Sequence, residues 1–197
     1  MSTSPRTRLS PEQRRRQLLD LGVRLFARFP IEALSIDVLA QEAGISRGLL
    51  YHYFGDKLGF REAVVRRAAA DMVEKTRPPV EGEPVERLLA SVAAYVDWVD
   101  ANYEGYLSLV RGAASDAALR AVYDDARTAI TDLVFTEDVT HELIADTPAA
   151  RLLVRGWQAL VEELVLAWKA GETSVSRDEL LEMVVGTLPA IATVLAE

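Results

Sequence analysis

Hydrophobic residues recur along most of this chain at every third or fourth position, with polar residues between them. This spacing is typical of amphipathic α-helices. Leu18, Leu21, Leu25 and Phe29 give the first example. The strict alternation that indicates a half-buried β-strand is nearly absent. The pattern therefore predicts an all-α protein.

Capping residues, prolines and glycines divide this pattern into separate helices. The first helix has a capping box in Ser10-Pro11-Glu12-Gln13, with proline at its first position, and Pro30 stops it. Thr147-Pro148 and the capping box that opens at Ser176 start two later helices in the same way. We expect helices at about 11–29, 36–43, 47–53, 57–75, 85–102, 103–114, 117–135, 148–170 and 177–196.

The segment RPPVEGEP, residues 77–84, interrupts the helical pattern with three prolines and a glycine. We place a domain boundary here. It separates an N-terminal domain, residues 1–76, from a larger C-terminal domain, residues 77–197. The fourth helix, 57–75, would connect the two.

Two short helices, 36–43 and 47–53, are joined by a tight turn. Ala40 supplies a small residue where such helices cross, and Gly44 supplies one that tolerates positive φ. An apolar seam at suitable spacing would join the pair: Leu39, Ala43, Ile45 and Leu50. This is the layout of a helix-turn-helix, whose second helix enters the major groove of DNA. An ordinary helical hairpin also uses alanine and glycine in this way.

The charge distribution favours a polyanionic partner for the N-terminal end. Residues 1–67 contain 12 Lys and Arg against 7 Asp and Glu, a net charge of +5, whereas residues 68–197 contain 10 against 23, a net charge of −13. Such asymmetry indicates that one end contacts nucleic acid while the acidic remainder is repelled by it.

Other classes are disfavoured by composition. The chain has no cysteine and only two histidines, far apart at His52 and His141, so we expect no disulfide and no metal site. No apolar run approaches a membrane span, and the first residues lack the apolar middle of a secretory signal. We therefore expect a cytoplasmic protein that does not bind membranes.

The exposed face of helix 47–53 carries the side chains suited to DNA. We expect Ser46, Arg47, Gly48, Tyr51 and His52 to lie on it. Arg47 can bind guanine or a phosphate, Gly48 lets the backbone approach the duplex closely, and Tyr51 can bind a phosphate or a thymine methyl. His52 taken alone is more typical of an ordinary surface histidine.

Two more polar residues belong to this set. Lys57 stands at the start of the fourth helix, where its ammonium group and the free backbone N–H groups could hold one phosphate. Ser35, which can cap helix 36–43, is included among the DNA-binding residues.

The segment SIDVLAQEAGISRGLLYHYFGDK, residues 35–57, resembles the DNA-binding signature of the TetR family of bacterial transcriptional regulators. The resemblance extends over about residues 10–67. It implies a homodimer with a three-helix DNA-binding head and a larger helical ligand-binding domain in each subunit. It also implies that Arg47, Gly48, Tyr51, Tyr53 and Lys57 touch DNA. Leu49 departs from the pattern, because the family commonly has Thr or Ser there.

Aromatic residues gather in the C-terminal domain, where no catalytic constellation, phosphate loop or metal spacing appears. We take Tyr95, Trp98, Tyr103, Tyr106 and Trp157 as candidates for effector binding, because ligand pockets are mostly apolar and aromatic. The alternative is that they belong to the core or to an interface. We expect neither enzymatic activity nor a cofactor.

The last two predicted helices, 148–170 and 177–196, carry wide apolar stripes. We expect them to pair with a second copy in a four-helix interface with twofold symmetry. The residues assigned to this interface are Leu153, Leu160, Leu164, Trp168, Val184, Leu188 and Ile191. Both stripes are also compatible with an intramolecular core.

These features together predict a homodimeric repressor that binds a palindromic operator in double-stranded DNA and is released by a small-molecule effector. The alternative is a helical DNA-binding or partner-binding protein without an effector. An acidic helical enzyme that happens to contain a helix-turn-helix is a further class. A cavity of several hundred Å3 in the C-terminal domain would favour the effector; a fully packed domain would not.

Overall fold

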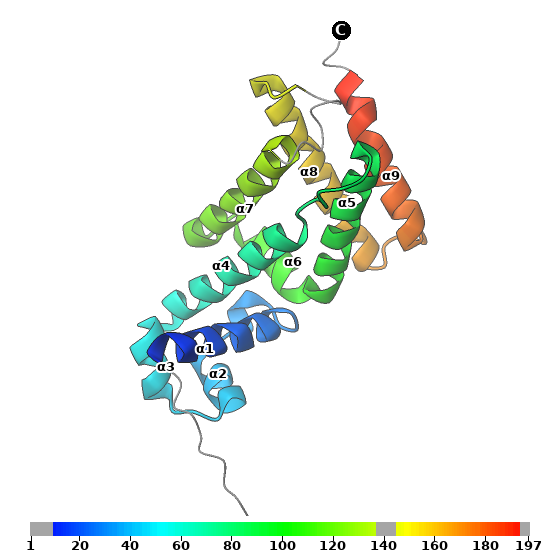
Figure 1. The fold of residues 1–197 in the computed structure, drawn as a ribbon. Helices are drawn as coiled ribbons and strands as arrows, with labels where there is room; N and C mark the ends of the chain where they lie inside the picture. The colour runs from blue at the N-terminus through cyan, green and yellow to red at the C-terminus, as the bar shows by residue number, and fades with distance from the viewer. Residues whose placement is uncertain (1–9, 137–144, 194–197) are drawn as a thin grey trace, which may run out of the picture.

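The computed structural model describes residues 10–136 and 145–193, and within these ranges every regular segment is a helix (Figure 1). The prediction of an all-α protein is confirmed. The helices are α1 (Pro11–Phe26), the short 3-10 helix η1 (Ile31–Ala33), α2 (Ile36–Ala43), α3 (Arg47–Phe54), α4 (Lys57–Lys75), α5 (Pro84–Ala101), α6 (Tyr103–Gly112), α7 (Ala117–Thr136), α8 (Pro148–Lys169) and α9 (Arg177–Ala192).

The predicted caps start the helices. Ser10 and Ser176 each form a capping box, and Ser35, Ser46 and Thr147 each accept a backbone N–H from the first turn of the helix that follows. Each cap satisfies a backbone donor that has no partner within its own helix. The helix starts are therefore encoded locally.

One predicted helix end needs correction and another cannot be compared. The first helix stops at Phe26, three residues before the predicted end, because proline at position 30 disfavours helical backbone at Phe29 and the chain turns beforehand. Phe29 consequently lies partly exposed instead of in the core. The last helix ends at Ala192, and the rest of the predicted helix, residues 194–196, lies outside the described residues.

The molecule is elongated, with a small bundle of α1, α2 and α3 at one end and the larger group of helices α5 to α9, here called the body, at the other (Figure 1). Helix α4 spans the junction. It packs against α1 at one end of the molecule and against α7 at the other. Any rotation of α4 relative to the body therefore moves the small bundle.

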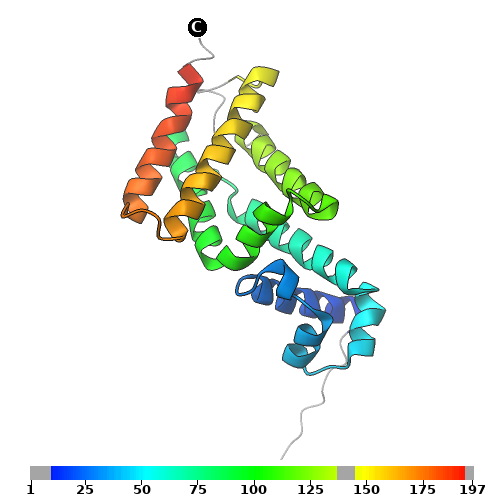
Figure 2. The same cartoon turned by 180° about the vertical axis from the view of Figure 1, so that it is seen from behind.

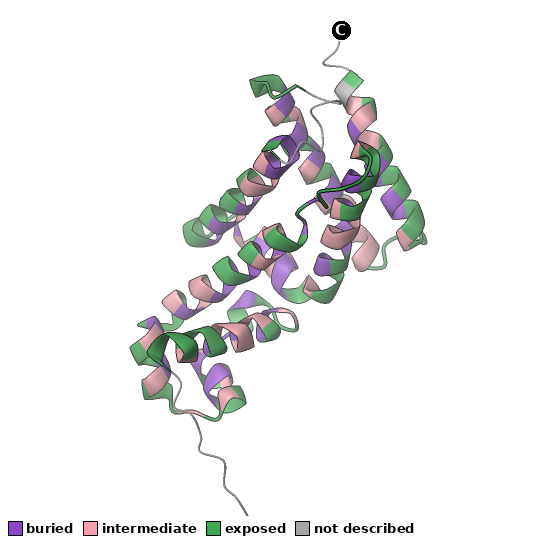
Figure 3. Cartoon of the chain, in the orientation of Figure 1, coloured by how far each residue is buried: buried purple, intermediate pink, exposed green. Residues whose placement is uncertain are grey.

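The core of the small bundle confirms the predicted helix-turn-helix packing. Leu39 and Leu50 are fully buried between α2 and α3, and Gly44 ends α2 with a φ of 62°. Glycine adopts this left-handed conformation without the steric cost that other residues incur. Purple, buried positions line the inner sides of these helices in Figure 3.

Close helix crossings tie α1 to its neighbours. A Cβ atom placed on Gly22 of α1 would lie 2.4 Å from Val64 Cγ2 of α4, so only glycine allows this approach. In the body, α9 packs against α5 and α8, and α8 also contacts α7. Helices α8 and α9 lie side by side on the face seen in Figure 2. None of the helices in the described ranges combines the length and apolarity that a membrane crossing requires.

Candidate functional sites

The outer face of α3 presents the predicted DNA-contacting residues to solvent. Arg47, Gly48, Tyr51 and His52 are all exposed, as is the N-cap residue Ser46. The exposed fraction of Tyr51 is 49%, which is unusual for a large aromatic side chain without a partner. The opposite face of the same helix supplies Leu50 and Phe54 to the core, and this fixes which residues point outward.

Arg47 forms an ion pair with Asp37 of α2, with a distance of 2.5 Å between Arg47 Nε and Asp37 Oδ1. The two side chains are 69% and 60% exposed, so the pair contributes little to stability. The guanidinium group is held across the turn and can exchange Asp37 for a base or a phosphate. The sequence did not predict a role for Asp37, which lies in the first turn of α2.

Tyr53 and Leu49 lie at the edge of this face. Tyr53 is half-buried against the core, and its ring meets the ring of His52 edge-on at 5.4 Å between centroids. Leu49, which departs from the family pattern, is also half-buried. Unlike Thr or Ser, a leucine side chain cannot donate a hydrogen bond to a phosphate, and here it is partly covered by the protein.

The predicted phosphate clamp at the start of α4 is partly occupied. Lys57 is exposed at the first position of the helix, but Asp56 Oδ1 accepts the Gly59 N–H at 2.8 Å. The first-turn amides available to a phosphate are therefore those of Lys57 and Leu58. Ser35 is half-buried and its hydroxyl caps α2 by accepting the Val38 N–H at 3.2 Å.

The C-terminal body contains a cavity of about 80 Å3 between α4, α5, α6, α7 and α8. The C-terminal domain is therefore not fully packed, but its cavity is smaller than the several hundred Å3 that would favour an effector. Most of the wall is apolar, and Tyr95, Trp98, Tyr106 and Trp157 of the predicted effector set line it. Tyr103, the fifth member, is half-buried at the start of α6 and does not belong to the lining, so the structure does not group it with the others.

A chain of tyrosines converges on Glu162 at this wall. Tyr106 donates to Glu162 Oε2 at 2.7 Å and Tyr123 donates to Glu162 Oε1 at 2.8 Å. The Tyr95 and Tyr106 hydroxyl oxygens are 2.8 Å apart. Since the Tyr106 proton is directed at the carboxylate, Tyr95 is the donor of that bond. Tyr95 and Tyr106 were predicted from the sequence, whereas Tyr123 and Glu162 were not.

Burial and the neighbouring carboxylate keep these tyrosines neutral. Burial is the main cause that raises the pKa of Tyr95 and of Tyr106 well above the ordinary value for tyrosine, and the charge of Glu162 adds to it. Partial burial and the hydrogen bond to Glu162 raise the pKa of Tyr123 to about 12. The hydroxyl groups therefore remain donors at neutral pH.

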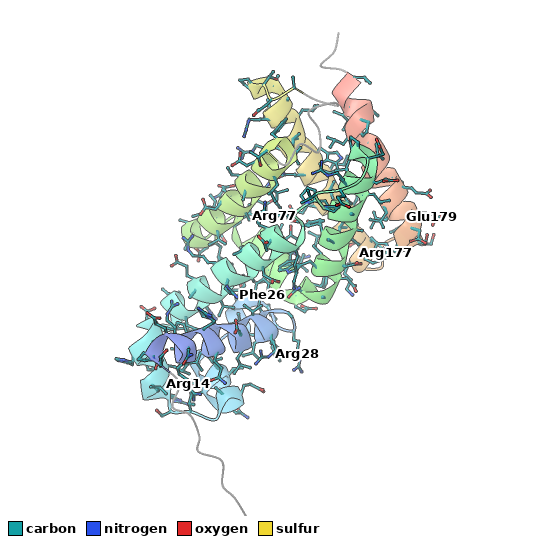
Figure 4. The ribbon with its side chains drawn as sticks, viewed as in Figure 1. Arg14, Phe26, Arg28, Arg77, Arg177 and Glu179 are labelled. Atoms are coloured by element: carbon teal, nitrogen blue, oxygen red, sulfur yellow. The ribbon has the colours of Figure 1, made fainter. Side chains whose placement is uncertain are left out.

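The cavity reaches the small N-terminal bundle through Phe26, the last residue of α1, which is fully buried and belongs to the cavity wall. Phe26 lies at the junction labelled in Figure 4. A Cβ atom on Gly105 of α6 would lie 2.3 Å from the Phe26 carbonyl oxygen, so α6 rests directly on this helix end. Ser108 of α6 accepts the Ile31 N–H at 3.0 Å and donates to Glu32 Oε2 at 2.8 Å.

The outer side of α8 and α9, here called the α8–α9 face, exposes apolar side chains at Leu152, Leu160 and Met183. Gly156 of α8 and Gly186 of α9 are exposed as well, and a Cβ atom on either would meet nothing within 4 Å. Of the predicted interface residues, Leu160 is exposed, and four others are half-buried: Leu153, Leu164, Trp168 and Ile191.

The structure corrects the predicted interface at two positions. Val184 and Leu188 have no exposed surface and belong to the chain's own core. The apolar stripe of α9 is wide enough to serve two surfaces, and the sequence did not separate the inward rows from the outward ones.

In the described part of the chain, no group of three His, Cys, Asp or Glu side chains is placed to hold a metal ion. His141 lies outside the described residues.

A basic helix-turn-helix head joined by one long helix to an acidic helical body defines the class of helix-turn-helix transcriptional regulators. The comparison with known proteins narrows this class. The model of the bacterial regulatory proteins of the tetR family matches residues 18–64, and the model of a tetracyclin repressor-like C-terminal domain matches residues 84–190. This chain belongs to the TetR family.

Individual relatives agree over most of the chain. A TetR-family transcriptional regulator from Streptomyces coelicolor superposes with a TM-score of 0.80 at 34% identity, covering 92% of this chain and 84% of that one. The HTH-type transcriptional activator FasR of Mycolicibacterium smegmatis is 26% identical over 89% of this chain and 81% of its own length.

A second curated relative matches only in part. The HTH-type transcriptional regulator BetI of Burkholderia cenocepacia is 38% identical over 44% of this chain, which spans 46% of that protein. These relatives are transcriptional regulators and not enzymes, which confirms the prediction that this chain is not an enzyme.

Proposed function

We propose that this DNA-binding regulator is a homodimeric repressor that leaves a palindromic operator when a small molecule occupies the cavity of its body. The observation that carries the proposal is the position of Phe26, which is at once part of the cavity wall and the last residue of α1 in the head. A ligand that moves this wall necessarily acts on the head.

The head, residues 1–76, would read the operator with α3. Arg47 would exchange Asp37 for guanine or phosphate, and Gly48 would bring the helix backbone against the duplex. Tyr51, His52 and Lys57 would complete the contact. The remaining predicted contacts, Ser35, Ser46 and Tyr53, are placed at the start of α2, the start of α3 and the edge of its outer face.

The α8–α9 face would form the dimer. Leu160 and Met183 expose 39% and 48% of their surface, and Leu152 exposes 73%. Gly156 and Gly186 have open space above them, so a second copy can approach the helix backbones closely. Twofold pairing places two heads on one duplex, and their recognition helices need a separation of about 34–36 Å to enter successive major grooves.

Release would follow from unequal ligand affinity for two arrangements of head and body. A ligand shifts such an equilibrium only by the difference between its affinities for the two forms. In the described conformation the body holds the head through Ser108, Gly105 and Phe26, while α4 packs on both parts. These are the contacts that a ligand can change.

The experiment begins with selection of bound duplexes from a random oligonucleotide pool, which supplies the operator. We expect a palindrome that is occupied by one or more dimers. Operator affinity is then measured with and without each compound that binds the body. Failure to select any duplex at low salt contradicts the DNA-binding part, and unaltered affinity in the presence of every bound compound contradicts the effector part.

The sense of regulation needs a separate measurement, since the relative FasR is an activator. Transcription from a promoter that carries the selected operator should fall when the protein is added. A rise in transcription would exclude the repressor.

A further inference from the structure

A row of polar side-chain links joins α7 to α8, and we call this row the α7–α8 seam. Its four links are Tyr123 to Glu162, Arg127 to the Arg155 carbonyl oxygen, Gln158 to Thr131, and Arg151 to Asp132. Tyr123, Arg127 and Thr131 follow one another at intervals of four, so they lie on one face of α7. The seam therefore runs along the two helices, which are neighbours in Figure 2.

The seam borders the cavity of the body. Tyr123 and Arg127 of α7 belong to the cavity wall, as do Gln158 and Glu162 of α8. Most of the wall is buried. Apart from Ser91 and Tyr95 of α5, every lining residue that keeps exposed surface lies on α7 or α8. The protein therefore covers the cavity least completely along these two helices.

The closed seam leaves polar groups unsatisfied. Arg127 Nε and Gln158 Oε1 are buried and have no hydrogen-bond partner among the described residues. A buried donor or acceptor without a partner has lost its bonds to water and gained nothing in return. If the two helices move apart, water can reach both atoms. Hydration of these atoms therefore offsets part of the free energy that opening costs.

The packing of α9 on α5 and α8 differs in kind. Val184 and Leu188 of α9 have no exposed surface and belong to the core. Separation of apolar surfaces exposes them to water without any compensating bond, whereas a polar link is exchanged for bonds to water at a small net cost. Helices α7 and α8 therefore part more readily than α8 and α9.

We propose that the α7–α8 seam is the gate through which a small molecule enters the cavity. The closed cavity of about 80 Å3 is well below the roughly 300–1,000 Å3 of ordinary ligand pockets, so a ligand of usual size needs the helices to move apart. Because α7 also packs against α4, a ligand that keeps the seam open acts on the helix that carries the head. This inference rests on the proposed effector function and adds the route of entry.

The test places one thiol inside the cavity of the full-length protein, without DNA or ligand. The chain has no cysteine, so Ala69→Cys supplies the only one. Ala69 lies on α4, lines the cavity and is 7% exposed. The rate at which N-ethylmaleimide labels this thiol under native conditions, followed by mass spectrometry, reports how often the cavity opens.

Two matched substitutions are then added to this background. Thr131→Val and Thr187→Val each remove a hydroxyl that accepts one side-chain hydrogen bond and donates to a carbonyl oxygen of its own helix. Thr131 belongs to the seam, whereas Thr187 accepts from Trp157 and so joins α9 to α8. We expect Thr131→Val to speed labelling about fivefold and Thr187→Val less than about twofold, because each lost bond favours the opening that it restrained.

Equal acceleration by both substitutions, or none by Thr131→Val, refutes the gate. Tyr123→Phe serves if Thr131→Val does not fold, because it removes the link to Glu162 from the same seam. It should also speed labelling, and an unchanged rate in that variant counts equally against the gate.

These outcomes are separable from those of the proposed function. Labelling that ignores the seam, while a bound compound still lowers operator affinity, refutes the gate alone. Labelling that follows the seam, while operator affinity is unaltered by every bound compound, supports the gate and contradicts effector-controlled release.

Discussion

Gly48 and Arg47, neighbours on helix α3, would serve the proposed DNA contact by different means. Gly48 has no side chain, and the space next to it is open, since a Cβ atom there would meet nothing within 4 Å. Arg47 contributes a guanidinium group that Asp37 holds at the surface. Glycine at position 48 makes the helix less stable than alanine would, and such a local cost is common at binding sites.

Gly48→Ala should separate stability from DNA binding. Alanine favours an exposed helix interior over glycine by about 1 kcal/mol, so the free energy of unfolding should rise. Operator affinity should fall about tenfold or more, because the new methyl group occupies the space intended for the duplex. Urea unfolding and operator titration check the two effects; a variant that is stabilised and still binds with full affinity would contradict the role assigned to Gly48.

Lys57→Ala should weaken binding to all duplexes alike, because a phosphate contact carries no sequence information. The slope of log affinity against log salt should become shallower by about one. Lys75→Ala is the control: Lys75 stands at the far end of the same helix and pairs with Asp71. An unchanged slope for Lys57→Ala, or an equal change for both variants, would refute the phosphate contact.

The buried tyrosines should make stability depend on alkaline pH. Tyrosine ionises near pH 10 in an unfolded chain, whereas folding raises the pKa of Tyr123 to about 12 and that of Tyr95 and Tyr106 well above normal. Between these pKa values the folded chain keeps tyrosine protons that the unfolded chain loses. The stability that this contributes is complete below pH 10 and is lost as the pH rises through the pKa values of the folded chain. Urea midpoints measured from pH 9 to 12 should decline, and Tyr123→Phe should decline less steeply.

Helices α1, α4 and α6 form the junction at which cavity and head meet. Glycines at the two crossings, Gly22 and Gly105, allow backbone approaches that any side chain would block. Packed helices of this kind shift between discrete arrangements and do not deform continuously. The junction is therefore the element most suited to carry a change from the body to the head.

Ser108→Ala tests this junction, because it removes the hydroxyl that joins α6 to η1. The free energy of unfolding should fall by about 1 kcal/mol. The ratio of operator affinities without and with a compound that binds the body should move toward one, while the affinity for that compound itself is retained. Ser115→Ala is the control, since the Ser115 hydroxyl bonds only to the nearby Gly112 carbonyl oxygen. If Ser108→Ala shows the same ratio of operator affinities as the wild type, the contact between α6 and η1 does not transmit the change to the head.

The whole molecule combines a net positive head with a net negative body. We expect the body to repel the duplex and the head to face it, and pairing through the α8–α9 face would set two heads on one side of the dimer. Figure 2 shows α8 and α9 side by side at the end of the molecule away from the small N-terminal bundle.

Leu160→Glu should dissociate the dimer, because two carboxylates would meet across the twofold axis in an apolar surface. The mass in solution should fall to that of one chain, 21.7 kDa, and operator affinity should fall with it. Val80→Glu is the control, as Val80 is 88% exposed and lies in the segment between α4 and α5, outside both helices of the α8–α9 face. A wild-type chain that is monomeric at micromolar concentration would refute the pairing.

The sequence by itself determined the helix starts, the helix-turn-helix and its outward face. These depend on local rules: serine caps, a glycine with φ of 62° at Gly44, and an apolar seam whose spacing leaves Arg47 and Tyr51 outside. The family followed from the same short segment. Interactions between neighbours in the chain can be read from the order of residues alone.

Only the tertiary structure decided which C-terminal residues meet. It joined Glu162 of α8 to tyrosines of α6 and α7, and it left Arg127 and Gln158 unsatisfied in one wall. It placed Val184 and Leu188 in the core rather than on the interface. The reason is that a wide apolar stripe does not specify which row faces inward, and a polar pair formed by distant helices has no periodic signal along the chain.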